Sequence, residues 1–267
     1  MDHGSIILAS SVRIIGKREV ALGPMRCRGL LAVLALQPNI VVAYDRLASM
    51  LWNDPIESAR PNLRSLATGI RAALRRAGVG TAVELRTHRA AWGGTGGYSL
   101  EMPRSQIDLH RVHLLKRQSK DCLEADPSRA KRICEEAIDL RVGNFGPGLP
   151  STLWFEQQRE RFVRIQHSLH LLHGCISVML GEYGGEFTAL QHVQAADLST
   201  SHMEATAIQL YCQGHVLASL EQLRLADRRC REVGLDLPDS SRRIQKAILD
   251  DDKDTVIEET RNLARSL

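Results

Sequence analysis

The fold is decided by residues 58–78, which read SARPNLRSLATGIRAALRRAG. The apolar side chains in this stretch recur every three or four residues, which gathers them on one face of an α-helix. Ser58 is suited to cap the helix, Pro61 is tolerated in its first turn, and Gly78 is suited to end it. The stretch therefore predicts an amphipathic helix over residues 59–77. Its apolar face is formed by Leu63, Leu66, Ala67, Ile70, Ala73 and Leu74.

The opposite face of this helix is rich in arginine and in short hydroxyl side chains. The outward positions are Arg64, Ser65, Thr68, Ala72 and Arg75, with Arg71 at the boundary between the two faces. Residues 58–83 hold five arginines and no acidic residue. Cations without neighbouring carboxylates can approach DNA phosphates, so this face is predicted to enter a major groove. The alternative interpretation of the same pattern is a solvated helix face.

Shorter patterns surround this helix. Strands are predicted over residues 6–9, 12–15, 19–22, 82–86 and 97–102, and helices over residues 24–36 and 44–52. The dipeptide Gly16-Lys17 is suited to a tight turn between two of the strands. The order of strands, three helices and a hairpin predicts a winged helix-turn-helix, in which the third helix reads the groove. Arg86, His88 and Arg89 would then be DNA contacts of the wing.

From Asp108 onward the apolar spacing is helical, and no strand pattern interrupts it. Helices are predicted near residues 107–124, 128–142, 152–180, 186–198, 202–214, 216–233, 239–250 and 255–267. Two segments share a glycine turn and a following helix, like part of a tetratricopeptide unit. The predicted fold class is mostly α with a small β component. We expect a winged helix-turn-helix domain over residues 1–105 and an all-helical, tetratricopeptide-like domain over residues 106–267, whose stacked helices would bind partners or self-associate.

Composition and charge narrow the class of protein. The 267 residues are 43% hydrophobic and 25% charged, which is typical of a folded protein of about two domains. The longest apolar run, residues 30–36, is far below the roughly 18 to 20 residues that span a bilayer, and no signal peptide is indicated. We therefore expect a cytoplasmic, nucleoid-associated protein without a membrane partner. Residues 1–107 carry 14 Lys and Arg against 7 Asp and Glu, so the basic charge is concentrated there.

The sequence offers no arrangement of residues that would carry catalysis or hold a cofactor. The six cysteines never reach C-x-x-C spacing and are interpreted as free thiols. His167, His170 and His173 recur at helical spacing, but they lack nearby Asp, Glu or Cys at ligand spacing. The glycine-rich residues 93–97 lack the Lys-Ser/Thr of a phosphate loop and are expected to form a hairpin tip. We predict a protein that is not an enzyme and uses no cofactor or metal.

Several spaced motifs resemble those of a known family. In the N-terminal part they are LGPMRCRGLLA at residues 22–32, VVAYDRL at residues 41–47, Leu51-Trp52 and SARPNL at residues 58–63. In the C-terminal part they are DLHR at residues 108–111, EAIDL at residues 136–140, Trp154, and GLDLP at residues 234–238 followed by Ile248-Leu249. In this order they look like the Streptomyces antibiotic regulatory proteins, whose small members pair a winged helix with a bacterial transcriptional activator domain. The resemblance covers nearly the whole chain.

The resemblance implies a pathway-specific transcriptional activator of antibiotic or other secondary-metabolite genes. Such an activator binds direct repeats in double-stranded DNA near the promoter and recruits RNA polymerase holoenzyme through its sigma factor and other subunits. A homodimer on DNA is expected from the repeated sites. Carried onto this chain, the family's recognition helix predicts DNA contacts by Arg60, Asn62, Arg64, Ser65, Thr68 and Arg71. Phosphates would be held by Arg75 and by the wing residues Arg86, His88 and Arg89.

The chain departs from the family pattern in its recognition helix. Residues 68–71 read Thr-Gly-Ile-Arg where relatives usually have Ser-Arg-Leu-Arg, so one expected arginine is missing. Gly69 is expected to weaken the helix by roughly 1 kcal/mol. Arg141 also stands where relatives usually carry tryptophan. The DNA sequence that is read is therefore expected to differ.

Two other functions stay open at this point. The first is a helical-repeat scaffold for protein interactions, in which the winged helix has no preference for a DNA sequence; Gly69 favours this alternative. The second is a regulator gated by a small molecule, because a concave helical surface can hold a ligand without leaving a sequence motif.

Overall fold

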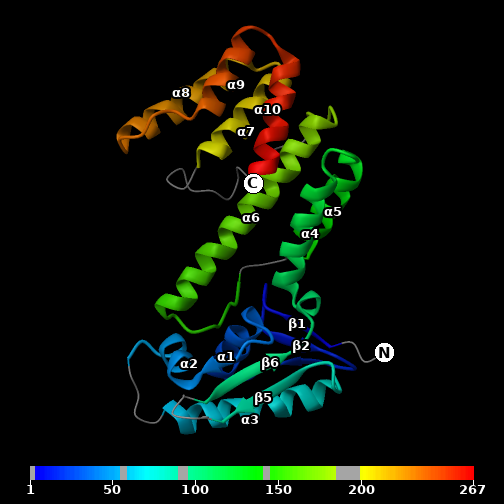
Figure 1. The fold of residues 1–267 in the computed structure, drawn as a ribbon, viewed down its shortest axis with the longest axis vertical. Coiled ribbons are helices and arrows are strands. Elements are labelled where there is room, and N and C mark those ends of the chain that lie inside the picture. The colour runs from blue at the N-terminus through cyan, green and yellow to red at the C-terminus, as the bar shows by residue number, and fades with distance from the viewer. Residues whose placement is uncertain (1–3, 55–58, 90–95, 141–144, 185–198) are drawn as a thin grey trace. The chain divides into compact units, whose positions relative to one another are not determined.

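The computed structural model describes residues 4–54, 59–89, 96–140, 145–184 and 199–267. The chain divides into two compact units, each made of two chain segments (Figure 1). The first unit consists of Met1–Leu114 and Asp139–Arg164, and the second of Leu115–Ile138 and Ile165–Leu267. In the described parts of the chain, no helix is both long enough and apolar enough to cross a membrane.

A small antiparallel sheet with strand order β1-β2-β3 opens the first unit. Its strands are β1 (Ser5–Ile7), β2 (Arg13–Ile15) and β3 (Glu19–Ala21). The predicted turn at Gly16-Lys17 is confirmed, because β2 and β3 pair antiparallel across it. The predicted strand over residues 6–9 ends earlier, because the backbone N–H groups of its last two residues donate to the Asp108 carboxylate instead of to a strand.

Three helices and a second antiparallel sheet follow. The helices are α1 (Met25–Leu36), α2 (Tyr44–Leu51) and α3 (Ala59–Ala77), and the strands are β4 (Val42–Ala43), β5 (Glu84–His88) and β6 (Gly97–Glu101) in the order β4-β6-β5. Helix α3 has the predicted bounds, while its predicted cap, Ser58, lies outside the described residues. Strand β5 begins later than predicted, because residues 79–82 form a turn closed by a backbone hydrogen bond of 3.2 Å. Strand β4 was not predicted, because a strand of two residues is too short to show an alternation of apolar and polar side chains.

One hydrophobic core holds the first unit together. Residues 30–35 of α1 are all buried, because α1 packs against α2, α3 and β6. The core also contains four side chains from beyond residue 139, namely Phe145, Leu149, Phe155 and Phe162. The first unit extends beyond the predicted domain of residues 1–105, since residues 106–114 and the described residues 139–140 and 145–164 also belong to it.

Polar contacts tie the start of α4 (Asp108–Cys122) and the residues before α6 (Leu153–Met179) to the N-terminal elements. Asp108 is 6% exposed, and its carboxylate accepts hydrogen bonds of 2.8 Å from the backbone N–H groups of Leu8, Ala9 and Leu109. Burial raises the pKa of this carboxyl, while the N–H donors oppose the rise. Arg28 of α1 donates to the carbonyl oxygen of Gly148 from Nε at 3.1 Å and from Nη2 at 3.0 Å.

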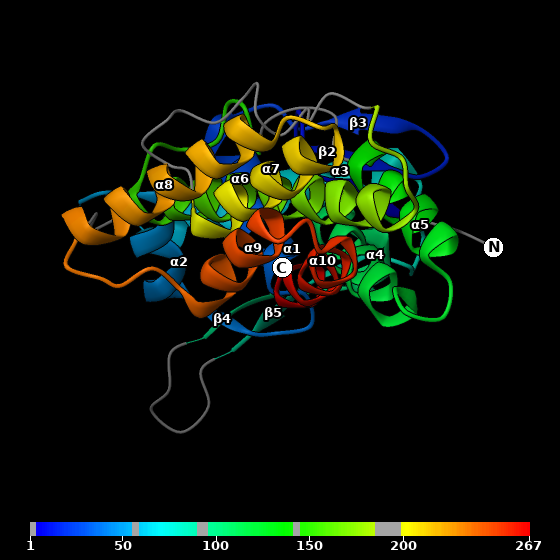
Figure 2. The same cartoon turned by 90° about the horizontal axis from the view of Figure 1, so that it is seen from above.

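The described residues of the second unit form helices. A short 3₁₀ turn, η1 (Arg104–Gln106), precedes α4 in the chain and belongs to the first unit. Helices α4 and α6 continue into this unit. Its other helices are α5 (Pro127–Asp139), α7 (Thr200–Cys212), α8 (Val216–Glu232), α9 (Asp239–Leu249) and α10 (Lys253–Ser266). Figure 2 shows α7 beside α8 and α9 beside α10, which are antiparallel pairs of the kind that helical repeats stack.

The helices closely match the prediction for the C-terminal part. The predicted helix over residues 186–198 lies outside the described residues. The last helix begins two residues before the predicted start, because Asp252 caps it by accepting a hydrogen bond of 3.0 Å from the backbone N–H of Thr255. The predicted fold class, mostly α with a small β component, is confirmed.

Candidate nucleic-acid interface

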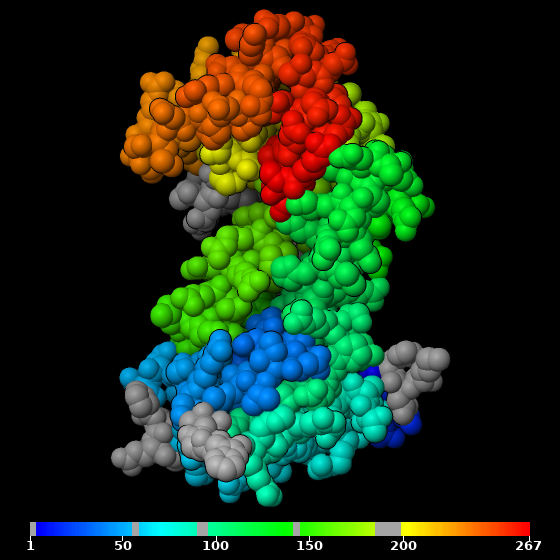
Figure 3. All heavy atoms as spheres, viewed as in Figure 1, coloured from blue at the N-terminus to red at the C-terminus, as the bar shows by residue number. Residues whose placement is uncertain are grey.

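Helix α3 presents a positively charged face to solvent along its length. Its apolar face lies in the core, which leaves the opposite face exposed. The exposed residues are Arg60, Pro61, Asn62, Arg64, Ser65, Thr68, Gly69, Arg75 and Arg76. No residue of α3 is acidic, and the space-filling view shows the helix, light blue to cyan, at the surface of the first unit (Figure 3). Such a surface can meet phosphates without repulsion.

The middle of this face is open for contact. Arg64 and Ser65 are exposed, and no side-chain hydrogen bond or ion pair joins Arg64 to another described residue. The Thr68 hydroxyl donates to the backbone carbonyl oxygen of Arg64 at 3.0 Å, which leaves the hydroxyl oxygen as an acceptor. The three side chains together offer donors and acceptors that base edges in a major groove can use.

Arg26 places a further cation beside the N-terminal half of α3. Its guanidinium carbon lies 5.3 Å from the ring centre of Trp52. Arg26 and Trp52, together with Asn62 and Ser65, line an open groove of about 350 Å³. The sequence analysis missed Arg26, because only its place in the first turn of α1 distinguishes it from other surface arginines.

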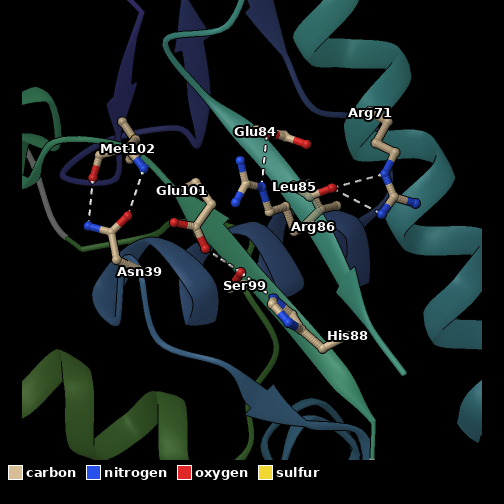
Figure 4. A network of polar contacts seen from close by, with 9 residues as sticks. All are labelled: Asn39, Arg71, Glu84, Leu85, Arg86, His88, Ser99, Glu101 and Met102. Atoms are coloured by element: carbon tan, nitrogen blue, oxygen red, sulfur yellow. Dashed lines mark hydrogen bonds and ion pairs between the residues drawn. The ribbon is translucent and has the colours of Figure 1, made fainter. Parts of the chain in front are cut away.

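Two arginines at the edges of the α3 face contact aromatic rings. The guanidinium carbon of Arg60 lies 5.9 Å from the ring centre of Tyr44, and that of Arg71 lies 5.9 Å from the ring centre of Tyr98. The two tyrosines pack edge to face, with their ring centres 5.2 Å apart. Arg71 is half-buried and also donates to the carbonyl oxygen of Leu85 (Figure 4), so its predicted place at the boundary of the two faces is confirmed.

The wing hairpin contributes two exposed arginines, Arg86 on β5 and Arg89 just after it. The Nε atom of Arg86 donates to Oε2 of Glu84 at 3.0 Å, and both side chains are 56% exposed. An ion pair this exposed is weak, so a phosphate can compete for Arg86. The sequence analysis missed Glu84, although side chains two apart in a strand share one face. Of the predicted hairpin tip, residues 93–97, residues 93–95 lie outside the described residues and Gly97 begins β6.

His88 begins a short hydrogen-bond chain across the two wing strands (Figure 4). Its Nε2 atom lies 2.8 Å from Oγ of the buried Ser99, and Oγ donates to Oε1 of Glu101 at 2.6 Å. Because Ser99 uses its only proton on Glu101, the hydrogen of the first bond must belong to His88 Nε2. The ring can then donate to a phosphate through Nδ1 only when the imidazole is protonated.

Gly69 lies on the exposed face of α3, where neither the available space nor the backbone conformation requires a glycine. A Cβ atom there would meet only the Cys27 sulfur, at 3.4 Å, which is ordinary contact. We expect Gly69→Ala to raise the free energy of unfolding by about 0.5–1 kcal/mol, because alanine loses less backbone entropy in a helix. Urea denaturation checks this. The control is Gly29→Ala, which puts Cβ 2.8 Å from a Leu51 methyl carbon and is expected to destabilise; lower stability of Gly69→Ala would contradict the prediction.

The histidines considered as metal ligands lie along α6. One of them, His173, has its Nε2 atom 3.2 Å from Oε1 of Glu135. No group of three His, Cys, Asp or Glu is placed to hold a metal ion in the part of the chain that the structure describes. Burial raises the pKa of Cys134 and of Cys175 to about 12, so neither thiol ionises appreciably at neutral pH.

Three helices, a hairpin wing beside the third of them and a following run of helices define the class: a winged-helix protein with a helical C-terminal part. Residues 107–249 match the profile of the family described as bacterial transcriptional activator domain. The match spans more than half of the sequence, and the chain belongs to this family, whose members are transcriptional regulators and not enzymes. The resemblance to the Streptomyces antibiotic regulatory proteins is thereby confirmed.

A solved structure of Mycobacterium tuberculosis EmbR, in complex with a low-affinity phosphopeptide, is similar to the chain. The TM-score is 0.83 at 19% sequence identity, and the similarity covers 100% of this chain and 70% of the EmbR chain. At this level of identity the likeness shows a shared fold. No curated protein sequence matches the chain.

Proposed function

We propose that this transcriptional activator binds DNA sequence-specifically and reads its promoter with α3. The observation that carries the proposal is the exposed face of that helix, where Arg64, Ser65 and Thr68 stand together without a carboxylate. Arginine can donate to guanine through two N–H groups, and serine or threonine can contact several base edges. The neighbouring cations supply the sequence-independent attraction to phosphates.

The proposed contact residues lie on this face and on the wing. They are Arg60, Asn62, Arg64, Ser65, Thr68, Arg71, Arg75, Arg86, His88 and Arg89. We propose that the middle of α3 reads base edges and that the exposed Arg75, Arg86 and Arg89 hold phosphates. Arg60, Arg71 and His88 already contact other groups of the chain, so any DNA contact by them competes with those interactions.

The partners follow from the family. We propose that the protein binds direct repeats upstream of antibiotic or other secondary-metabolite genes as a homodimer, which matches two recognition helices to two repeats. We further propose that it recruits RNA polymerase holoenzyme, including the sigma factor, at the nucleoid in the cytoplasm. The helical pairs of the second unit support this, because stacked pairs provide an extended surface for a protein partner.

The test is a gel-shift titration of the full chain against DNA fragments upstream of its neighbouring genes, at two salt concentrations and with random competitor DNA. We expect one fragment to be preferred over competitor by about a thousandfold or more, with a log–log salt slope of about −0.9 per phosphate contact. Equal, weak and wholly salt-sensitive retention of all fragments would contradict the proposal and favour the interaction scaffold. Retention that requires an added small molecule would favour the ligand-gated regulator.

A further inference from the structure

The side chain of Arg71 joins the recognition helix to the wing. Its Nε and Nη2 atoms donate to the carbonyl oxygen of Leu85 on β5, at 3.1 and 3.0 Å, and Nη2 also donates to Oγ1 of Thr87 at 2.7 Å. Figure 4 shows the guanidinium reaching from α3 to β5. Because the same guanidinium lies near the ring of Tyr98 on β6, one side chain contacts both strands of the wing.

These contacts occupy the open edge of the wing sheet. In the strand order β4-β6-β5, β5 is the edge strand and has no strand partner on its outer side. The backbone groups of an edge strand otherwise face water. Arg71 takes the place of a neighbouring strand beside Leu85, with charged donors that form stronger hydrogen bonds than neutral ones. The side chain therefore fixes where β5 lies relative to α3.

The same contacts limit what Arg71 can do on DNA. A guanidinium has five N–H donors, and the contacts with Leu85 and Thr87 use the one on Nε and both on Nη2. Bidentate reading of guanine needs two donors on one edge of the guanidinium. Both such edges include Nη2, because one pairs it with Nε and the other with Nη1. Arg71 would have to release the wing before it could read guanine in this way.

We propose that Arg71 is a positioning residue, which holds the wing against the recognition helix so that both meet DNA together, and that it reads no base itself. This inference rests on the proposed DNA-binding function. It goes beyond that function, because it assigns the position of the wing arginines Arg86 and Arg89 relative to α3 to one contact. That contact joins the side chain of Arg71 to its acceptor Thr87.

The first test is a double-mutant cycle on the full chain with the preferred DNA fragment. We expect Arg71→Ala to weaken binding about tenfold, uniformly over a panel of single base-pair changes, and Thr87→Val to weaken it less. The double variant should bind no more weakly than Arg71→Ala alone, because the two side chains act through one contact. The charge-matched control is Arg117→Ala on α4, outside the proposed DNA-binding surface, where the side chain is 83% exposed; it is expected to change affinity by about twofold or less.

The second test needs no DNA. We expect the backbone amides of residues 84–88 to exchange hydrogen faster in Arg71→Ala and Thr87→Val than in the wild type or in Arg117→Ala, because the edge of β5 is released. Unchanged exchange, or an Arg71→Ala variant that loses base preference at one position only, would overturn the proposal. Faster exchange in a chain that binds no DNA specifically would support the link between α3 and β5 while refuting the proposed function.

Discussion

Asp108→Ala is expected to lower the free energy of unfolding of the first unit by about 3 kcal/mol or more. The substitution removes the acceptor of three backbone hydrogen bonds, two of which come from Leu8 and Ala9, which are 0% and 2% exposed. Alanine offers no acceptor, and each buried N–H group left without one costs about 1–3 kcal/mol. Since a domain is stable by only about 5–15 kcal/mol in total, the loss is a large fraction of the whole.

Tryptophan fluorescence during urea denaturation measures the loss of stability in the first unit. All three tryptophans, Trp52, Trp92 and Trp154, belong to the chain segments of the first unit. The matched control is Asp121→Ala on the same helix, where the carboxylate is 67% exposed and 3.8 Å from Arg117, and it should change stability by less than about 0.5 kcal/mol. If Asp108→Ala and Asp121→Ala were equally stable, the role assigned to Asp108 would be wrong.

Arg64→Ala is expected to weaken binding to the target promoter by about 10- to 100-fold, with a much smaller effect on random DNA. Arg64 is the arginine in the middle of the exposed face, and no other described side chain holds it by a hydrogen bond or ion pair. Its donors are therefore available to a base, and the loss of a bidentate contact costs about 1–3 kcal/mol. Fluorescence anisotropy titrations on target and random duplexes at one salt concentration measure both affinities.

Arg75→Ala provides the comparison for Arg64→Ala. Arg75 is exposed on the last turns of α3 and is proposed to hold a phosphate. Its loss should weaken binding to target and random DNA alike and reduce the salt slope by about 1. An Arg64→Ala variant that kept both its affinity and its preference for the target would show that α3 meets DNA through other residues.

The sequence was sufficient to predict the elements that repeat a local pattern. Helix α3 has the predicted bounds because apolar spacing, a tolerated first-turn proline and a terminal glycine all lie within the segment itself. The half-buried position of Arg71 followed from the same geometry. The C-terminal helices were predictable for this reason as well.

The sequence was not sufficient for contacts between distant residues. The bonds from Leu8 and Ala9 to Asp108 span about 100 residues, and the bonds from Arg71 to β5 join a side chain to a backbone oxygen 14 residues away. Neither kind of contact leaves a periodic signal. The packing of Phe155 and Phe162 into the first unit was also hidden, because an apolar stripe on a helix does not reveal which neighbour covers it.

The late contribution of α6 to the first core has a consequence for synthesis on the ribosome. The winged helix is translated by about residue 101, but Phe155 and Phe162 emerge only some 50 to 60 residues later, which takes several seconds at about 5–20 residues per second. During that interval the nascent chain carries an uncovered apolar surface that chaperones can bind. A polypeptide released before Phe162 would not complete this core, so we expect aborted translation products to be degraded and not to compete with the finished activator for its promoter.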